Sequence, residues 1–156
     1  MKEINLTQGK VALVSDEDYD YLSQFKWHCS KCRNNYYAAR TVNMNGKSGH
    51  QILMHKEIMP CDKSMVVDHI DHNGLNNQRE NLRICTYSQN ACNYLKKKNN
   101  KCGYKGIYFN KLINRWFCQI KCKDIYFRQD FDKLEDAILA YNEKARELHG
   151  EFACIN

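Results

Sequence analysis

The chain has 156 residues, of which 43% are hydrophobic and 27% are charged, and its formal net charge is +6. This length allows one ordinary domain or two small ones. No segment approaches the roughly 18 consecutive apolar residues of a membrane-spanning helix, and the start "MKEINLTQGK" lacks the basic and then apolar pattern of a secretory signal. We therefore expect an intracellular protein with no membrane association.

The nine cysteines do not fit a disulfide framework, because their number is odd and no secretory signal precedes them. Cys29 and Cys32 form one C-x-x-C pair, but no second pair with zinc-site spacing follows it. Cys61, Cys85 or Cys92 could complete a zinc site from a distance. We expect the thiols to serve as small hydrophobic side chains and predict no structural zinc.

Positive charge is concentrated in one part of the chain. Residues 96–128 hold ten Lys or Arg and a single acid, whereas residues 129–156 hold three basic and seven acidic residues. The run "KKKNNK" at 96–101 by itself is typical of a solvated linker, but the basic residues after it alternate with aromatic ones. This pattern predicts a surface for a polyanion such as nucleic acid.

Residues 1–60 are predicted to be rich in β-structure. Apolar residues alternate on both sides of a turn at Gly9, which indicates a hairpin. The acidic "SDEDYDYL" suits a short helix with Ser15 or Asp16 as its N-cap. "NNYYAARTV" and "HQILMH" predict a second hairpin, although "ILMHKEIM" fits a short helix equally well. Pro60 closes the segment.

Residues 61–95 are predicted to form a strand, a loop, a strand and a helix. "MVVDHI" and "LRICT" are the strands, from their β-branched residues, and the loop between them is rich in Asn and Gly. Thr86 and Gln89 have the spacing of a capping box, which predicts a helix from about Tyr87 to Leu95.

Residues 102–156 are predicted to form three short strands and one helix. The strands are "KGIYFN", "RWFCQIKC" and "DIYFRQDF". Asp132 with Glu135 opens the helix in the manner of a capping box, and Gly150 stands where a helix ends. One apolar stripe runs along this helix, at residues 134, 137, 138, 141, 145 and 148. The chain as a whole is therefore predicted to be α+β.

The segment 61–95 has the residues for metal-assisted hydrolysis. His69, near the end of a strand, offers an imidazole that takes a proton from water near pH 7. Asp68 and the amide carbonyl of Asn90 offer hard oxygens that suit Mg²⁺ or Mn²⁺, and two protein ligands leave positions open for phosphate and water. Asp68 and His69 would face opposite sides of a regular strand, so the site needs a bulge or a strand end. The alternative is that these polar residues only tie down a turn-rich loop.

"VVDHIDHNGLNNQRENLRICTYSQNACN" resembles the HNH endonuclease motif, in the Asn-ended form of phage and intron-encoded homing endonucleases. Asp68 and His69 are adjacent, Asn81 lies twelve residues after His69, and Asn90 lies twenty-one after it. The resemblance implies a ββα-metal nuclease core over 61–95, preceded by the β-rich residues 1–60. It also implies that His69 activates water, that Asp68 and Asn90 hold one divalent ion, and that Asn81 orients His69 or braces the loop. A phage-infected or intron-bearing bacterial cell is the setting that it implies.

Two residues depart from this family's pattern. His72 stands where the family usually has Gly, and Lys56 stands where Arg is more usual. We interpret His72 as an inert surface residue, with a spare base or a phosphate contact as alternatives.

The last 55 residues resemble an AP2 DNA-binding domain, through "YKG", "RWFCQI", "EDAILAYNEKA" and "HGEFACIN". The resemblance implies a three-stranded antiparallel sheet in the major groove with a helix packed behind it. The positions that match the family's reading face are Lys105, Tyr108, Arg115, Trp116, Gln119 and Lys121. Phe117, Gln119 and Lys121 alternate along one strand, so we do not expect all three to face DNA at once. Gln129 departs from a family Gly, and a lone Trp is more often a core residue.

Three functions remain open from the sequence. The first is a metal-dependent, site-specific DNA endonuclease, with residues 1–95 as the catalytic part, 96–101 as a basic linker and 102–156 as the targeting domain. The second is a catalytically inactive DNA-binding regulator, and the third is a binder of structured RNA. We expect double-stranded DNA as the partner and no obligate protein partner, while a monomer that nicks and a dimer that cuts both strands stay open.

Overall fold

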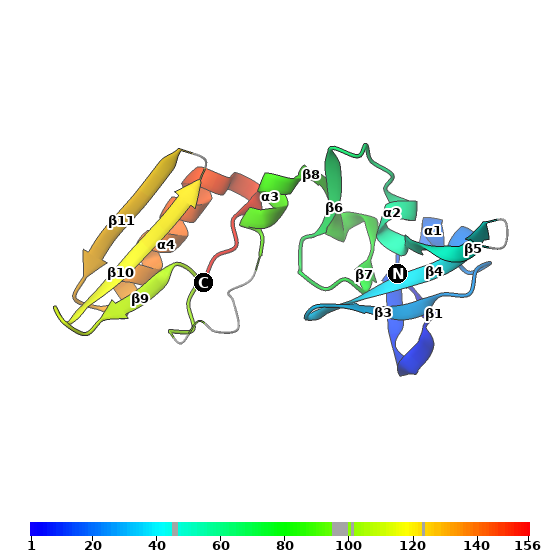
Figure 1. Ribbon diagram of the computed structural model, residues 1–156, viewed down its shortest axis with the longest axis horizontal. Helices are drawn as coiled ribbons and strands as arrows, with labels where there is room; N and C mark the ends of the chain where they lie inside the picture. Colours follow the sequence, from blue (N-terminus) through cyan, green and yellow to red (C-terminus); the bar gives the residue numbers. More distant parts are fainter. Residues whose placement is uncertain (45–46, 95–99, 101, 123) are drawn as a thin grey trace. The chain divides into compact units, whose positions relative to one another are not determined.

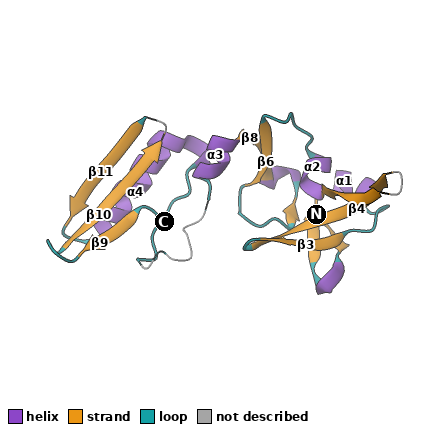
Figure 2. Cartoon of the chain, in the orientation of Figure 1, coloured by secondary structure: helices purple, strands orange, loops and turns teal. Residues whose placement is uncertain are grey.

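A computed structural model describes residues 1–44, 47–94, 100, 102–122 and 124–156 (Figure 1). The chain forms two compact units, Met1–Tyr87 and Ser88–Asn156, which are considered separately below. Several small sheets combine with few helices, as Figure 2 shows, so the predicted α+β class is confirmed. No helix in the described part of the chain is both long enough and apolar enough to cross a membrane.

The first unit contains three small sheets. The hairpin predicted around Gly9 is confirmed, since β1 (Lys2–Asn5) and β2 (Val11–Val14) pair antiparallel across a 3-10 turn. The short strand β7 (Asn76–Asn77) then pairs with β2 in parallel, with Val14 opposite Asn77. The sequence does not predict this pairing, which ties the Asn-rich loop to the N-terminal hairpin.

The second sheet has the order β3-β4-β5 and is antiparallel. Its strands are β3 (His28–Cys32), β4 (Asn35–Met44) and β5 (Lys47–Leu53). Both interpretations of "ILMHKEIM" hold in part, because β5 ends at Leu53 and the helix α2 (Met54–Ile58) begins at the next residue. The strand β3 is absent from the sequence prediction.

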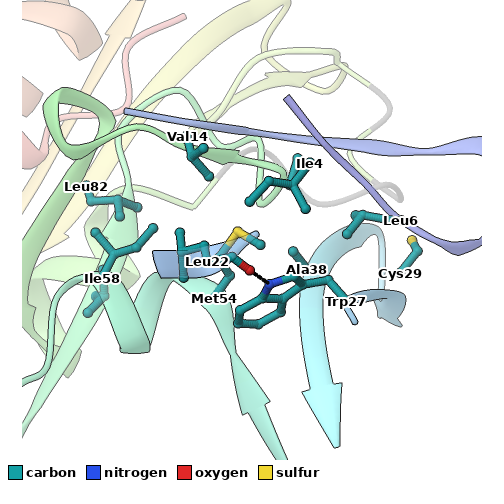
Figure 3. Close-up of a cluster of buried hydrophobic side chains, with 12 residues drawn as sticks. Ile4, Leu6, Val14, Leu22, Trp27, Cys29, Ala38, Met54, Ile58 and Leu82 are labelled. Carbon is teal, nitrogen blue, oxygen red and sulfur yellow. Dashed lines mark hydrogen bonds between the residues drawn. The ribbon is translucent and has the colours of Figure 1, made fainter. Parts of the chain in front are cut away.

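One hydrophobic core holds the first unit together (Figure 3). The helix α1 (Asp16–Leu22) has Ser15 as its N-cap, one of the two predicted. Its last residue, Leu22, is fully buried, and the carbonyl of Leu22 accepts a 2.8 Å hydrogen bond from Nε1 of Trp27, which is dashed in Figure 3. Val67 and Leu82 join this core from the third sheet, so that sheet is fixed to the rest of the unit.

The third sheet is the strand pair β6 (Met65–His69) and β8 (Leu82–Thr86), in regular antiparallel register from Met65 opposite Thr86 to His69 opposite Leu82. His69 is the last residue of β6, so the strand end that the predicted site requires is present. The helix α3 (Tyr87–Cys92) follows β8, in the predicted order. The helix ends at Cys92, earlier than predicted, and Leu95 itself lies outside the described residues, as does most of the predicted linker 96–101. The boundary between the two units falls after Tyr87, at the start of α3.

The second unit is a sheet of order β11-β10-β9 with one long helix against it (Figure 1). Its elements are β9 (Ile107–Asn110), β10 (Arg115–Cys122), β11 (Ile125–Phe131) and α4 (Leu134–His149). The predicted apolar stripe is confirmed, because Ala137, Tyr141 and Ala145 are buried against Cys118 and Ile120 of the sheet. The predicted N-cap is wrong by one residue, since the helix begins at Leu134 after Lys133.

Candidate active site

His69 lies in a buried polar cluster of the first unit. The residue is 6% exposed, and its Nε2 lies 3.4 Å from Oδ1 of Asn77. The ring of His55, from α2, meets the His69 ring edge to face with 4.9 Å between centroids, and the ring of Tyr37, from β4, lies at 5.9 Å. Three chain segments far apart in sequence therefore enclose one imidazole.

Both histidines are kept neutral by burial. Burial lowers the pKa of His55 to about 3, and the positive forms of His69 and Lys56 act in the same direction. Burial also lowers the pKa of His69, although the hydrogen bond to Asn77 and the charge of Asp71 oppose it. A neutral imidazole accepts a proton, so His69 is in the form that a general base requires at pH 7.

Asp68 is buried next to His69 but contacts a different neighbour. Its Oδ2 accepts hydrogen bonds from Nε and Nη2 of Arg83, at 3.0 and 2.9 Å, and Arg83 stands directly opposite it on β8. A carboxylate suits Mg²⁺ or Mn²⁺ as a ligand, so the chemistry of Asp68 fits the implied ion. Any ion held there shares the carboxylate with Arg83.

Asn90 is half-buried on α3 and belongs to the second unit, so its position relative to Asp68 stays a prediction. No group of three or more His, Cys, Asp or Glu residues in the described part of the chain could hold a metal ion. The donor set predicted here is different, because it combines one carboxylate with one amide oxygen.

Asn81 braces the loop between β6 and β8. Its Oδ1 accepts a hydrogen bond from the backbone N–H of Asp71, at 3.0 Å. Its Nδ2 donates to Oδ1 of Asp71 and to the carbonyl of Asn76, at 2.9 and 2.8 Å. Asn81 therefore links the two ends of the loop, while Asn77 supplies the contact to His69.

His72 occupies a backbone conformation that favours glycine, with φ at 64°. Its N–H donates to the carbonyl of His69, and its own carbonyl accepts from Nδ2 of Asn35, at 3.0 and 2.8 Å. Gly74 follows in a crowded position, where a Cβ atom would lie 2.5 Å from the carbonyl oxygen of Tyr36 and from the ring of Tyr37. The end of the β3–β4 hairpin thus packs directly on the loop beside His69.

The sheet of the second unit separates one predicted DNA-binding residue from the others. Trp116 packs on the α4 side, with Cys118 and Ile120. Residues of β10 at odd positions point to the other face because strands alternate with period two. Phe117, Gln119 and Lys121 therefore share that outer face, so their positions along the strand do not separate them, and which of them face DNA stays a prediction.

Arg115 and Tyr108 are further members of the predicted set on the outer face, whereas Lys105 lies before the first strand of the sheet. Arg115 lies next to Asp130 and Asp132, with 2.8 and 3.4 Å between the nearest nitrogen and oxygen atoms. Tyr108 of β9 is opposite Phe117 in register. Lys105 precedes β9, is half-buried, and donates from Nζ to the carbonyl of Cys92 at 2.7 Å.

Two residues on the outer face are additional to the six positions that match the family's reading face. The ring of Phe117 stacks on Tyr108, with centroids 5.2 Å apart and an interplanar angle of 11°. The guanidinium of Arg128 lies over the same Phe117 ring, 4.6 Å from its centroid. Unlike Arg115, Arg128 has no acidic partner among the residues that the structure describes. Strand alternation places Phe117 on the same face as Gln119, whereas the register of β10 with β11 places Arg128 opposite Gln119.

Comparison with known proteins gives two kinds of match. A family model described as HNH endonuclease matches residues 50–92, a range that includes His55, Asp68, His69, Asn77, Asn81 and Asn90. A protein named "Uncharacterized HNH endonuclease L560" from Acanthamoeba polyphaga mimivirus is 32% identical over 152 residues, which cover 96% of this chain and 76% of that protein. "Protein 3.8" of Escherichia phage T7 is 36% identical over 96 residues, 60% of this chain and 78% of the phage protein. No solved structure matches the chain. By its similarity to the mimivirus protein along almost its whole length, the chain belongs to the HNH endonuclease family.

Proposed function

We propose that the chain is a metal-dependent, site-specific DNA endonuclease of the homing type, with His69 as the general base. The single observation that carries the proposal is the buried, neutral imidazole of His69 at the end of β6, next to the buried carboxylate of Asp68. Burial of a base and a carboxylate side by side costs free energy that packing alone does not recover. The same pair of groups suits hydrolysis.

In this proposal His69 takes a proton from the attacking water while the phosphodiester bond breaks. Asp68 and Asn90 would hold one divalent cation, Mg²⁺ or Mn²⁺, which when bound stabilises the charge that develops on the phosphate and on the leaving 3′ oxygen. Asn81 keeps the loop between the strands in place through its bonds to Asp71 and Asn76. Hydrolysis in this manner leaves a 5′-phosphate and a 3′-hydroxyl.

The second unit is proposed to be an AP2-like domain that brings the nuclease to double-stranded DNA, with 96–101 as a basic linker. Support comes from the outer face of the sheet, where cationic and aromatic side chains lie together. The residues proposed to contact DNA are Lys105, Tyr108, Arg115, Gln119 and Lys121, with Phe117 and Arg128 added. Trp116 supports the sheet from its α4 side in this proposal. Lys and Arg neutralise phosphates, while Arg and Gln also read base edges.

The test is cleavage of supercoiled plasmids that carry candidate target DNA, with Mg²⁺ or Mn²⁺ against EDTA. Wild-type protein is compared with His69→Ala and with His50→Ala, a matched control at an exposed histidine. We expect nicking by wild type and by the His50 variant only with metal, and none by His69→Ala. Equal cutting by His69→Ala would refute the choice of base and direct attention to His72.

The alternative is a catalytically inactive regulator that binds DNA through the second unit. The ion pair between Asp68 and Arg83 favours it, because Arg83 already satisfies the carboxylate that would bind metal. This alternative predicts binding to plasmid DNA that persists at raised salt, with no nicking by any variant under any metal condition.

A further inference from the structure

Asn77 is fully buried, and its side chain contacts the ring of His69. The residue is 0% exposed, and its Oδ1 lies 3.4 Å from Nε2 of His69. Its backbone belongs to β7, which pairs in parallel with β2 and places Asn77 opposite the fully buried Val14. The backbone of Asn77 is thus held by the sheet and by the core of the unit.

Packing alone does not explain an amide at this position. The Nδ2 of Asn77 is buried and has no hydrogen-bond partner among the described residues. A buried amide nitrogen without a partner is unfavourable, and a leucine of similar volume would avoid the penalty. The contact of Oδ1 with His69 is the only side-chain hydrogen bond of Asn77 in the described structure, so that contact is what the amide provides.

An amide oxygen accepts hydrogen bonds and cannot donate them, which determines the chemistry at His69. A neutral imidazole carries one N–H, and the bond made by one ring nitrogen decides which nitrogen carries the proton. Because Oδ1 faces Nε2, the proton belongs on Nε2 and the lone pair on Nδ1.

We propose that Asn77 is a positioning residue that fixes His69 in the Nε2–H tautomer and makes Nδ1 the nitrogen that takes the proton from water. The inference rests on the proposed nuclease function for its consequence, but the tautomer itself is a property of the folded chain. His55 supports the arrangement, since its ring packs against the His69 ring at an interplanar angle of 86° and limits rotation of that ring.

The direct test reads the tautomer without any cleavage assay. Long-range ¹H–¹⁵N correlation spectra of the ¹⁵N-labelled full chain at pH 7.5 distinguish the two neutral tautomers of each histidine. The chain has six histidines, and the signal of His69 is identified by its loss in His69→Gln. We expect the Nε2–H pattern for His69 in the wild type; an Nδ1–H pattern would overturn the inference.

Two variants at the same position separate the hydrogen bond from packing. Asn77→Leu keeps the volume and removes the acceptor, so His69 should become a mixture of tautomers and nicking should fall by about 10- to 100-fold. Asn77→Asp keeps an acceptor at the same place, so the proton should stay on Nε2 of His69. A pure Nε2–H signal that persists in Asn77→Leu would refute the role of Asn77.

The inference and the proposed function fail in different ways. If the wild type shows the Nε2–H pattern and loses it in Asn77→Leu, the tautomer assignment stands even when no plasmid is cut. If the wild type cuts DNA and loses cutting in His69→Ala, but His69 shows the Nδ1–H pattern, the nuclease function stands and the role of Asn77 falls. Should Asn77→Leu fail to fold, the wild-type spectrum by itself still decides the tautomer.

Discussion

Asp68 and Arg83 form a buried ion pair across the two strands that carry the candidate site. Their side chains are 8% and 13% exposed, and two nitrogen atoms of the guanidinium lie within 3.0 Å of the same carboxylate oxygen. The family resemblance assigns the negative charge of Asp68 to a metal ion, but in this structure Arg83 compensates that charge. Folding of the first unit therefore does not require an ion at Asp68, and the pair links metal binding to stability.

Replacement of Arg83 by Met should make the fold depend on metal. Removing one partner of a buried pair leaves an uncompensated charge and costs about 3–5 kcal/mol of unfolding free energy. If Asp68 is a ligand, millimolar Mn²⁺ should restore part of that loss because the ion replaces the missing positive charge. Urea unfolding of Arg83→Met in EDTA and in Mn²⁺ measures both effects.

Two controls belong to the Arg83 experiment. Arg40→Met breaks a comparable ion pair with Glu57, far from Asp68 in sequence. The unfolding free energy that this variant loses should therefore not be restored by Mn²⁺. Asp68→Asn combined with Arg83→Met removes both charges and should recover most of the stability in EDTA. An Arg83→Met protein whose stability is the same with and without Mn²⁺ would argue against Asp68 as a metal ligand.

The stability of the first unit should depend on pH through His55. The folded pKa of about 3 lies below the ordinary value of 6.5, so between these values the unfolded chain binds a proton that the folded chain does not. The stabilisation is therefore complete above about pH 6.5 and is lost as the pH falls, by up to about 1.4 kcal/mol per pH unit. His55→Phe keeps an aromatic ring and removes this proton.

The pH dependence is measured by urea unfolding at pH 7.5, 6 and 5. The wild type should lose more unfolding free energy over this range than His55→Phe does, while the exposed-site variant His50→Phe should follow the wild type. Parallel curves for wild type and His55→Phe would mean that another group causes the acid sensitivity.

His72→Gly should stabilise the chain or leave it unchanged, although it replaces a side chain with none. The left-handed conformation of His72 costs a residue with a Cβ roughly 1–2 kcal/mol, and glycine avoids most of this strain. His72→Ala keeps the strain, so the unfolding free energy of His72→Gly should be about 1 kcal/mol higher than that of His72→Ala. If His72 is inert in catalysis, both variants should nick DNA at the wild-type rate; loss of nicking in both would assign His72 a chemical role.

Arg128 should contribute more to DNA binding than Arg115 does. Arg115 lies against Asp130 and Asp132, whereas Arg128 is exposed and its guanidinium lies over the Phe117 ring. We expect Arg128→Gln to weaken binding to duplex DNA of any sequence and to reduce the salt slope of binding by about 1, as for loss of one phosphate contact, and Arg115→Gln to weaken binding less.

Fluorescence anisotropy with a labelled mixed-sequence duplex of about 30 base pairs, at several salt concentrations, compares the two variants. Lys133→Gln, at the start of α4, is a control that removes one positive charge outside the outer face. An Arg115→Gln protein that binds more weakly than Arg128→Gln would show that the acids do not restrain Arg115 in the complex.

Local patterns were sufficient to predict most elements of this chain. The strands 82–86 and 115–122 and the apolar stripe of α4 follow from periodicity and β-branched or aromatic content, which are properties of neighbouring residues. The strands β3 and β7 could not be predicted in this way. "HCSKC" has weak strand propensity, and a two-residue strand such as β7 exists only because β2 lies beside it.

The sequence by itself determined the family and the spacing of Asp68, His69, Asn81 and Asn90, because a motif is a matter of residue order. Only the tertiary structure decided which side chains meet. Asn77 contacts His69, Arg83 compensates Asp68, and α4 covers the face of the sheet that carries Trp116 and not the face that carries Gln119. Such contacts depend on strand register, on which face of a strand is buried, and on the packing of distant segments, so they follow from the whole fold.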